Sequence, residues 1–195
     1  MRLEAIVLAA GAGTRYGGGK LLAPWRGGLL LDGALAAAFA SPVRGVYVVW
    51  GADPGVPKAA EDFATRSGHA DRLRLVNAPE HTMGLSRSLS AGVAALPGDG
   101  DGVFIFLGDM PRIPTGVTAQ MARALSGGAQ AVATTFDGRR GHPVLFGRGL
   151  WTRLASLTGD RGAGELLRDL GEALAMVPAP DDGVLFDVDR PDDLV

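Results

Sequence analysis

Cysteine is absent from this sequence, and aromatic residues make up only 6% of it. The missing cysteine excludes disulfides, thiolate metal sites and cysteine nucleophiles. Basic residues are not in excess, because the formal net charge is −2. Proteins that bind nucleic acid usually carry a basic face, often with aromatic side chains among the basic ones, so we expect no nucleic-acid partner.

Long hydrophobic runs are also missing, since no apolar stretch approaches the ~20 residues of a membrane span. The first residues, MRLEAIVLAAGAG, place a glutamate before a very short apolar run, which indicates a buried strand rather than a signal peptide. We therefore expect a cytoplasmic protein with no membrane partner. The 195 residues, 47% of them hydrophobic, are enough for one sizeable core, and we expect a single domain spanning residues 1–195.

Short apolar runs alternate with longer patterns typical of helices. The runs are almost continuously apolar, as in VYVVW and VFIFL, which suits strands covered on both faces. This alternation predicts an α/β fold with three layers, α/β/α and Rossmann-like, around a mostly parallel central sheet. The expected strands are Leu3–Ala9, Gly45–Trp50, Leu73–Asn77, Gly102–Leu107, Ala129–Phe136 and Pro143–Phe146. The expected helices are Leu29–Ala40, Lys58–Arg66, Ser86–Leu96, Thr115–Leu125, Leu150–Leu157 and Gly164–Leu170.

The segment VLAAGAGTRYGGGK (7–20) carries the strongest functional signal. It begins as an apolar strand and continues as a loop with five glycines, Arg15 and Lys20. Glycine allows several backbone N–H groups to point at one anion, and the two basic side chains add charge where a polyphosphate needs it. Leu21 after Lys20 excludes a Walker A loop, and Tyr16 stands where a dinucleotide fingerprint has its third glycine. The remaining candidate is a nucleotidyltransferase loop.

Carboxylates follow two of the expected strands. Asp109 comes directly after VFIFLG, and in a parallel sheet it should meet the glycine loop at the carboxyl edge, where it could hold Mg²⁺ against phosphate oxygens. Its structural alternative is a turn aspartate. Asp187 and Asp189 in DVDRPDDL (187–194) alternate along an expected strand and would point to opposite faces. One of them, preferably Asp189, is therefore the second expected metal ligand.

The segment HTMGLSRSLSAG (81–92) predicts a loop that enters a helix. Ser86 could cap this helix, and the first N–H groups of the helix could receive an anion. Plain capping is the structural alternative to nucleotide binding by Ser86 and Ser88.

Two later segments carry basic residues next to glycines. RRGHPVLF (139–146) places Arg140 and His142 before a buried strand, either in a solvated turn or in an acceptor-binding loop. GDRGAGELL (159–167) opens a helix and carries Arg161, so it is either an ordinary helix entry or a second anion site.

Taken in order, LAAGAGTRYGGGKLL, GLSRSLSAG, FLGDMP, GRRGHPVLF, GDRGAGELL and FDVDRPDDL resemble the MobA-like nucleotidyltransferases of molybdenum cofactor biosynthesis. The resemblance covers residues 4–194, and the later motifs look most like the branch that makes molybdopterin cytosine dinucleotide. It implies a nucleotidyltransferase fold, Mg²⁺ as cofactor, and a nucleoside triphosphate and a molybdopterin-type acceptor as substrates. A molybdoenzyme would receive the product.

The resemblance also implies roles for single residues. Arg15 and Lys20 match basic residues on the triphosphate, Asp109 matches the main Mg²⁺ ligand, and Asp189 lies where related transferases place a second one. The stretch LAAG, in place of LAGG, reads the base through its backbone and favours CTP over GTP. The residues expected to bind the nucleotide are Leu8, Ala9, Ala10, Gly11, Gly13, Arg15, Lys20, Ser86 and Ser88. The residues expected near the acceptor are Arg140, His142 and Arg161.

The expected reaction is an in-line attack of the acceptor phosphate on the α-phosphorus, with release of pyrophosphate. The acceptor is already ionised, so catalysis needs alignment and charge neutralisation rather than a strong base. Two alternatives remain open. One is a transferase of the same fold that uses GTP or acts on a sugar or polyol phosphate, and the other is a non-enzymatic nucleotide-binding maturation factor.

Overall fold

The structure, a computed structural model, describes residues 1–159 and 163–194. In these ranges the strands are β1 (Leu3–Ala9), β2 (Pro24–Trp25), β3 (Gly28–Leu29), β4 (Val46–Trp50), β5 (Leu73–Asn77), β6 (Gly102–Leu107), β7 (Ala131–Phe136), β8 (Arg139–Gly147) and β9 (Leu174–Pro178). The α-helices are α1 (Leu30–Ala40), α2 (Gly55–Arg66), α3 (Leu85–Ala94), α4 (Val117–Ser126), α5 (Trp151–Ala155) and α6 (Gly164–Asp169). Among these described helices, none is long and apolar enough to cross a membrane.

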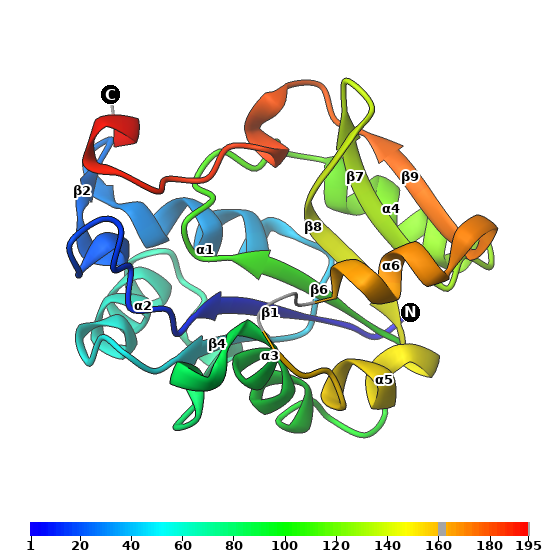
Figure 1. Ribbon diagram of the computed structural model, residues 1–195, viewed down its shortest axis with the longest axis horizontal. Coiled ribbons are helices and arrows are strands. Elements are labelled where there is room, and N and C mark those ends of the chain that lie inside the picture. Colours follow the sequence, from blue (N-terminus) through cyan, green and yellow to red (C-terminus); the bar gives the residue numbers. More distant parts are fainter. Residues whose placement is uncertain (160–162, 195) are drawn as a thin grey trace.

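The central sheet of the described chain has seven strands in the order β5-β4-β1-β6-β8-β7-β9 (Figure 1). β8 runs antiparallel to its neighbours β6 and β7, and the other pairs are parallel. The predicted α/β fold with a mostly parallel sheet is confirmed. The chain moves from β1 outward to β4 and β5 and returns to place β6 on the other side of β1. This reversal opens a crevice at the carboxyl ends of β1 and β6, which is where open α/β sheets bind ligands.

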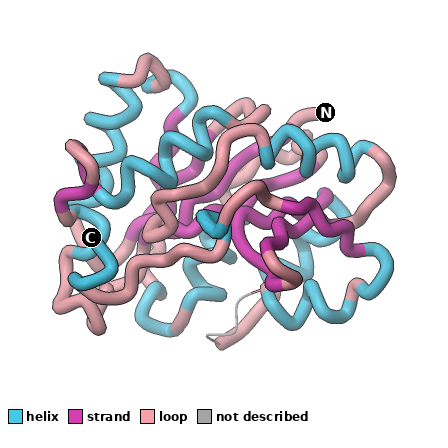
Figure 2. Tube along the Cα trace, turned by 90° about the horizontal axis from the view of Figure 1, so that it is seen from above, coloured by secondary structure: helices cyan, strands magenta, loops and turns pink. Residues whose placement is uncertain are grey.

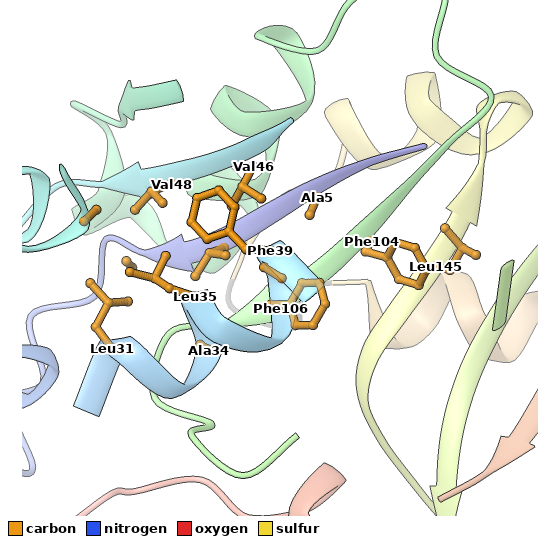
Figure 3. Close-up of a cluster of buried hydrophobic side chains, with 14 of the residues drawn as sticks. Ala5, Leu31, Ala34, Leu35, Phe39, Val46, Val48, Phe104, Phe106 and Leu145 are labelled. Carbon is orange, nitrogen blue, oxygen red and sulfur yellow. The ribbon is translucent and has the colours of Figure 1, made fainter. Parts of the chain in front are cut away.

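Two apolar clusters hold the helices on opposite faces of the sheet. Side chains alternate along each strand, so Phe104 and Phe106 of β6 face α1, α2 and α4, whereas Val103 and Ile105 face α3, α5 and α6. Figure 1 shows α1 on one side of the β1–β6 pair and α3 and α5 on the other. The close-up in Figure 3 shows side chains of α1 packed toward those of β1, β4 and β6. The predicted three layers are therefore present.

Helix α1 also fixes the loop that follows β6. Its Gly33 lies so close to this loop that a Cβ there would stand 2.4 Å from the carbonyl oxygen of Pro111. A residue larger than glycine would displace one of the two backbones, because such a contact is far shorter than van der Waals distance. Close packing of α1 thus holds the segment that carries Asp109.

The structure departs from the sequence expectations in the second half of the chain. The six expected strands are all present, but the last is β8, which begins four residues earlier than expected and includes the segment RRGH expected as a turn. This part pairs with β7 alone, beyond the last β6–β8 pair of Ile105 with Val144, and its first two residues are exposed, so they are polar. The sequence analysis missed β9, a half-exposed edge strand, and the short β2–β3 hairpin.

The strand expected around Asp187 is wrong. Residues 185–190 have no strand pairing and lie between two short 3₁₀ helices, Asp182–Val184 and Pro191–Leu194 (Figure 2). Val188 in this segment is fully buried beside Trp25 and Leu30. The alternating pattern of the sequence arises here from one buried side chain between two polar ones, and it needs no sheet partner.

A test of the central core is the substitution Phe104→Ala. Phe104 is fully buried between the sheet and the helices on its face, so the change removes apolar contacts and leaves a cavity. We expect the free energy of unfolding to fall by about 3–5 kcal/mol in urea denaturation. The control Met176→Ala truncates a side chain that is 41% exposed on β9 and should cost less than about 0.5 kcal/mol. Similar losses in the two variants would contradict this description of the core.

Candidate functional site

The glycine-rich loop curls back on itself directly after β1. Gly13 has a φ of +58°, and Gly17, Gly18 and Gly19 also have positive φ values. Residues other than glycine adopt such values only at an energetic cost. The carbonyl of Gly13 accepts hydrogen bonds from the N–H groups of Tyr16 and Gly18 at 3.0 and 3.1 Å. This turn brings the start of the 3₁₀ helix Lys20–Leu22 back against the strand end, so that a Cβ on Gly13 would lie 3.1 Å from the Cβ of Lys20.

Lys20 connects the loop to the carboxylates at the neighbouring strand end. Its Nζ lies 2.7 Å from Oδ2 of Asp109 and 3.9 Å from Oδ1 of Asp189, and only 11% of its side chain is exposed. The prediction that the loop after β1 and the segment after β6 meet at one edge is confirmed. Arg15 lies farther out with 79% of its side chain exposed, and it contacts Oδ2 of Asp189 at 3.3 Å.

The C-terminal segment is tied to this edge by backbone hydrogen bonds. The N–H of Val188 donates to the carbonyl of Asp109 at 3.1 Å. Asp193 accepts from the N–H groups of Asp189 and Arg190 at 2.9 and 2.7 Å, and these bonds lower the pKa of its carboxyl group. The segment thereby holds Asp189 beside Lys20, although it was expected to do so as part of a strand.

Asp187 shares the electrostatic environment of the other two carboxylates. Burial raises the pKa of its carboxyl group, and the negative charges of Asp109 and Asp189 raise it further. The absence of a strand removes the argument that Asp187 and Asp189 face opposite ways. Three carboxylates therefore lie around the single ammonium of Lys20, and negative charge exceeds the buried positive charge at this edge.

This donor set fits a divalent cation that arrives with a phosphate ligand. Within the described residues, no group of three or more His, Cys, Asp or Glu side chains has the geometry of a complete metal site. Asp109, after β6, and Asp189, in the C-terminal segment, nevertheless approach one cationic atom, the Nζ of Lys20. Mg²⁺ usually takes one or two carboxylates together with phosphate oxygens and water, so two protein ligands are sufficient for it.

A cavity of about 550 Å³ lies along this edge of the sheet. Most of the predicted nucleotide-binding residues line it, and Arg15 lines an adjoining hollow with Tyr16 and Asp189. Two residues that the sequence did not assign also line the main cavity: Asp53, after β4, and His81, after β5. The predicted residues in its lining are Leu8, Ala9, Ala10, Gly11, Gly13, Lys20, Ser88 and Asp109.

Ser86 is the exception among the predicted nucleotide-binding residues. Helix α3 begins at Leu85 with Gly84 at the capping position, so the prediction that Ser86 caps the helix is wrong. Ser86 lies inside the first turn, it is fully buried, and its Oγ has no hydrogen-bond partner in the described part of the chain. It does not line the cavity, whereas Ser88 does.

A second cavity of about 270 Å³ adjoins the first. Leu8, Leu85 and Leu107 line both, so the two spaces are contiguous. The walls of the second cavity are mainly aliphatic, and its polar side chains are those of Arg140 and His142 on β8. These two predicted acceptor residues thus lie together on a strand rather than in the expected turn or loop. Arg161 lies outside the described residues.

His142 is held in its neutral form by its surroundings. Burial lowers the pKa of its imidazole, and this effect outweighs the opposing effects of the carbonyl of Ile105, 3.5 Å from Nδ1, and the charges of Asp109 and Asp187. A neutral imidazole can donate and accept hydrogen bonds without adding charge to the cavity.

Asp53 and His81 gave weak signals in the sequence. Oδ1 of Asp53 accepts from the N–H of Gly55 at 2.9 Å at the start of α2, which is the geometry of a turn aspartate. His81 lies in a short 3₁₀ helix, His81–Met83, after β5. Asp53 belongs to no segment that the sequence analysis singled out, and His81 begins the segment 81–92 but was given no role there. The folding of the β4 and β5 loops over the end of β1 brings both to the cavity.

Comparison with known proteins agrees with this geometry. A family model described as the MobA-like NTP transferase domain matches residues 5–174. The nicotine blue oxidoreductase of Paenarthrobacter nicotinovorans is 29% identical over 192 residues, which cover 94% of this chain and 90% of that protein. The molybdenum cofactor cytidylyltransferase of Escherichia coli is 23% identical over 198 residues, covering 99% and 94% of the two chains.

Solved structures share the fold over the whole chain. The homologue of Mycobacterium tuberculosis Rv0371c from Mycobacterium sp. strain JC1 superposes with a TM-score of 0.81 at 28% identity, covering 99% of this chain and 94% of that one. The manganese complex of Rv0371c itself gives a TM-score of 0.71 at 24% identity, covering 99% and 96%. The family match includes the glycine loop and Asp109 and spans most of the sequence, and the chain therefore belongs to the MobA-like NTP transferase family.

Proposed function

We propose that this NTP transferase family member transfers the nucleotide of CTP to the phosphate of a molybdopterin-type acceptor, with Mg²⁺ and with release of pyrophosphate. The observation that carries the proposal is the contact between Lys20 Nζ and Asp109 Oδ2 at 2.7 Å. It joins a glycine-rich, phosphate-type loop to a carboxylate at the adjacent strand end. A triphosphate with its metal needs this combination of one fixed cation and one fixed anion.

The reaction needs little acid or base chemistry from the protein. An oxygen of the acceptor phosphate forms the new bond to the α-phosphorus, and the bond from that phosphorus to the β-phosphate oxygen breaks. Lys20 and Arg15 would stabilise the negative charge of the departing pyrophosphate. Asp109 and Asp189 would hold Mg²⁺, which when bound neutralises charge on the phosphates. In this assignment Lys20 exchanges a carboxylate partner for a phosphate partner when the substrate binds.

The second cavity is the proposed acceptor site. It opens to the first through shared leucines, so an acceptor in it reaches a nucleotide in the main cavity. Arg140 supplies a positive charge at its wall, and the neutral His142 supplies a hydrogen bond. Aliphatic walls suit the flat faces of a pterin ring, whose polar groups lie at its edge, better than a sugar, whose hydroxyl groups all round the ring would need many polar partners. This favours a molybdopterin-type acceptor over a sugar or polyol phosphate.

A second candidate function comes from the relative at 29% identity, which has the name of an oxidoreductase. An enzyme of this kind would reduce a ring compound held by the aliphatic walls of the second cavity, and it would need no triphosphate. The alternatives raised by the sequence also stay testable: use of GTP, and nucleotide binding without catalysis.

The first prediction concerns the reaction itself. We expect pyrophosphate release with CTP and Mg²⁺ only when molybdopterin is present, and much slower release with ATP, GTP and UTP. A coupled pyrophosphate assay over the four nucleotides, with and without molybdopterin, measures this. Preference for GTP would overturn the base assignment. Binding without release would favour a maturation factor, and consumption of a reduced nicotinamide dinucleotide with a dye would favour the oxidoreductase.

The second prediction concerns the charged pair at the strand edge. Lys20→Ala removes the buried cation and should lower kcat/KM for CTP by ~10²-fold or more, and Asp109→Asn should have an effect of the same order, because each removes a preorganised charge contact. The matched controls are Lys58→Ala and Asp62→Asn, which alter an exposed ion pair within α2. These should keep turnover within about twofold of the original protein, since exposed pairs contribute little. Near-normal turnover of Asp109→Asn would exclude it as the metal ligand.

The third prediction separates the two cavities. Arg140→Ala should raise KM for the acceptor about tenfold, because a charged hydrogen-bond partner is lost, while the Kd for CTP stays unchanged. Arg139→Ala is the matched control, because this neighbour lines a different hollow beside Phe136 and Phe186. Steady-state kinetics with varied acceptor, together with CTP titration, measures both constants. An equal effect of the two substitutions would place the acceptor elsewhere.

A further inference from the structure

His81 lines the main cavity on the β4 and β5 side of the sheet edge, whereas Asp109 lines it after β6. The cavity follows the strand order along the sheet edge, from the segments after β5 and β4, past the end of β1, to Asp109 after β6. His81 contacts Gly51 at the end of β4, two strand positions from β6. Strands are spaced about 4.8 Å apart, so this separation is about 10 Å. This distance allows a nucleotide whose phosphates lie at Lys20 and Asp109 to reach His81 with its base.

The hydrogen bonding of His81 fixes which ring nitrogen faces the ligand. Nδ1 lies 3.0 Å from the carbonyl oxygen of Ala78, and a carbonyl can only accept, so Nδ1 carries the proton. In the neutral ring Nε2 then has a free lone pair. Within the described residues Nε2 has no hydrogen-bond partner, and it is not among the buried polar atoms that lack one, so it is not fully buried. The half-buried ring thus presents a hydrogen-bond acceptor to the cavity.

Gly51 allows the ring to take this position. A Cβ at Gly51 would lie 2.6 Å from Cγ and 2.7 Å from Nδ1 of His81, so any larger residue would push the imidazole away. The loop after β4 is held against the residues that follow β1, because the N–H of Ala52 donates to the carbonyl of Ala10 at 3.2 Å. The ring edge with Nδ1 faces Gly51 and Ala78, so Nε2 lies on the opposite edge of a ring that lines the cavity.

We propose that His81 determines base specificity by accepting a hydrogen bond from the exocyclic amino group of cytosine through Nε2. The inference rests on the proposed function, which places a nucleoside triphosphate in this cavity. Cytosine carries an amino donor at position 4, where uracil carries a carbonyl acceptor. The fixed lone pair of Nε2 attracts the amino group of cytosine and repels the carbonyl oxygen of uracil, so His81 discriminates CTP from UTP. Gly51 is a positioning residue, because it acts only through the place it leaves for the ring.

The test compares the Kd of Mg²⁺–CTP with that of Mg²⁺–UTP by isothermal titration calorimetry, which needs no acceptor. The original protein should bind CTP at least tenfold more tightly than UTP. His81→Phe keeps an aromatic ring but removes the acceptor, and it should lower this ratio about tenfold. Gly51→Ala keeps His81 but displaces it, and should also lower the ratio. The control His69→Phe changes a histidine that stacks on Phe39, away from the cavity, and should leave the ratio unchanged.

Binding of inorganic pyrophosphate with Mg²⁺ is the second measurement. It depends on the glycine loop and should be the same in the original protein and in His81→Phe, which shows that a lower ratio does not come from a damaged site. An unchanged CTP/UTP ratio in both His81→Phe and Gly51→Ala would overturn the inference while the proposed function stands. If His81→Phe does not fold, Gly51→Ala alone decides in the same way. No preference for CTP in the original protein would overturn the proposed nucleotide, before any variant is considered.

Discussion

Lys20 and Asp109 are 89 residues apart in the chain, and their contact depends on the strands that precede them, β1 and β6, being adjacent in the sheet. Parallel pairing of β1 with β6 sets the register, and the N–H of Gly108 donates to the carbonyl of Leu8 at 2.9 Å just beyond the ladder. The carboxylate therefore lies beside the first residues of the glycine loop. A buried ammonium without this partner would be costly, so the pair keeps Lys20 in place when no substrate is bound.

The carboxylates at this edge of the sheet outnumber the buried basic groups. Asp109, Asp187 and Asp189 provide more negative charge than Lys20 neutralises, and Arg15 compensates only from an exposed position. In the proposed function, a divalent cation bound with a triphosphate adds both kinds of charge at once and gives each basic and acidic side chain a new partner. The excess of carboxylates over the buried ammonium is consistent with that proposal, since Mg²⁺ usually takes few protein ligands together with phosphate oxygens. The fold supplies the geometry, because β1, β6 and the C-terminal segment converge at one edge.

The sequence predicted the parts of the fold that follow from local pattern. Continuous apolar runs gave β1 and β6 with their observed bounds, since strands covered on both faces need apolar residues at each position. The partly exposed edge strand β5 was also predicted with its observed bounds, although it contains Arg74 and Asn77. Prediction from the sequence failed for segments that the rest of the protein covers only in part. The first residues of β8 are polar although they pair with β7, and β9 is a half-exposed edge strand. Residues around Asp187 show a strand-like alternation but bury a single side chain, Val188, without any ladder.

The candidate site divides in the same way. The sequence by itself determined the glycine loop, its two basic residues and the carboxylate after β6, because glycine content and the ends of apolar runs are local properties. Only the tertiary structure decided which residues share the cavity. It buried Ser86 inside α3, joined Arg140 and His142 to an aliphatic space, and brought Asp53 and His81 to the main cavity. These placements depend on strand order and loop packing. Both result from contacts between segments that are far apart in the sequence, and a local sequence pattern carries no information about such contacts.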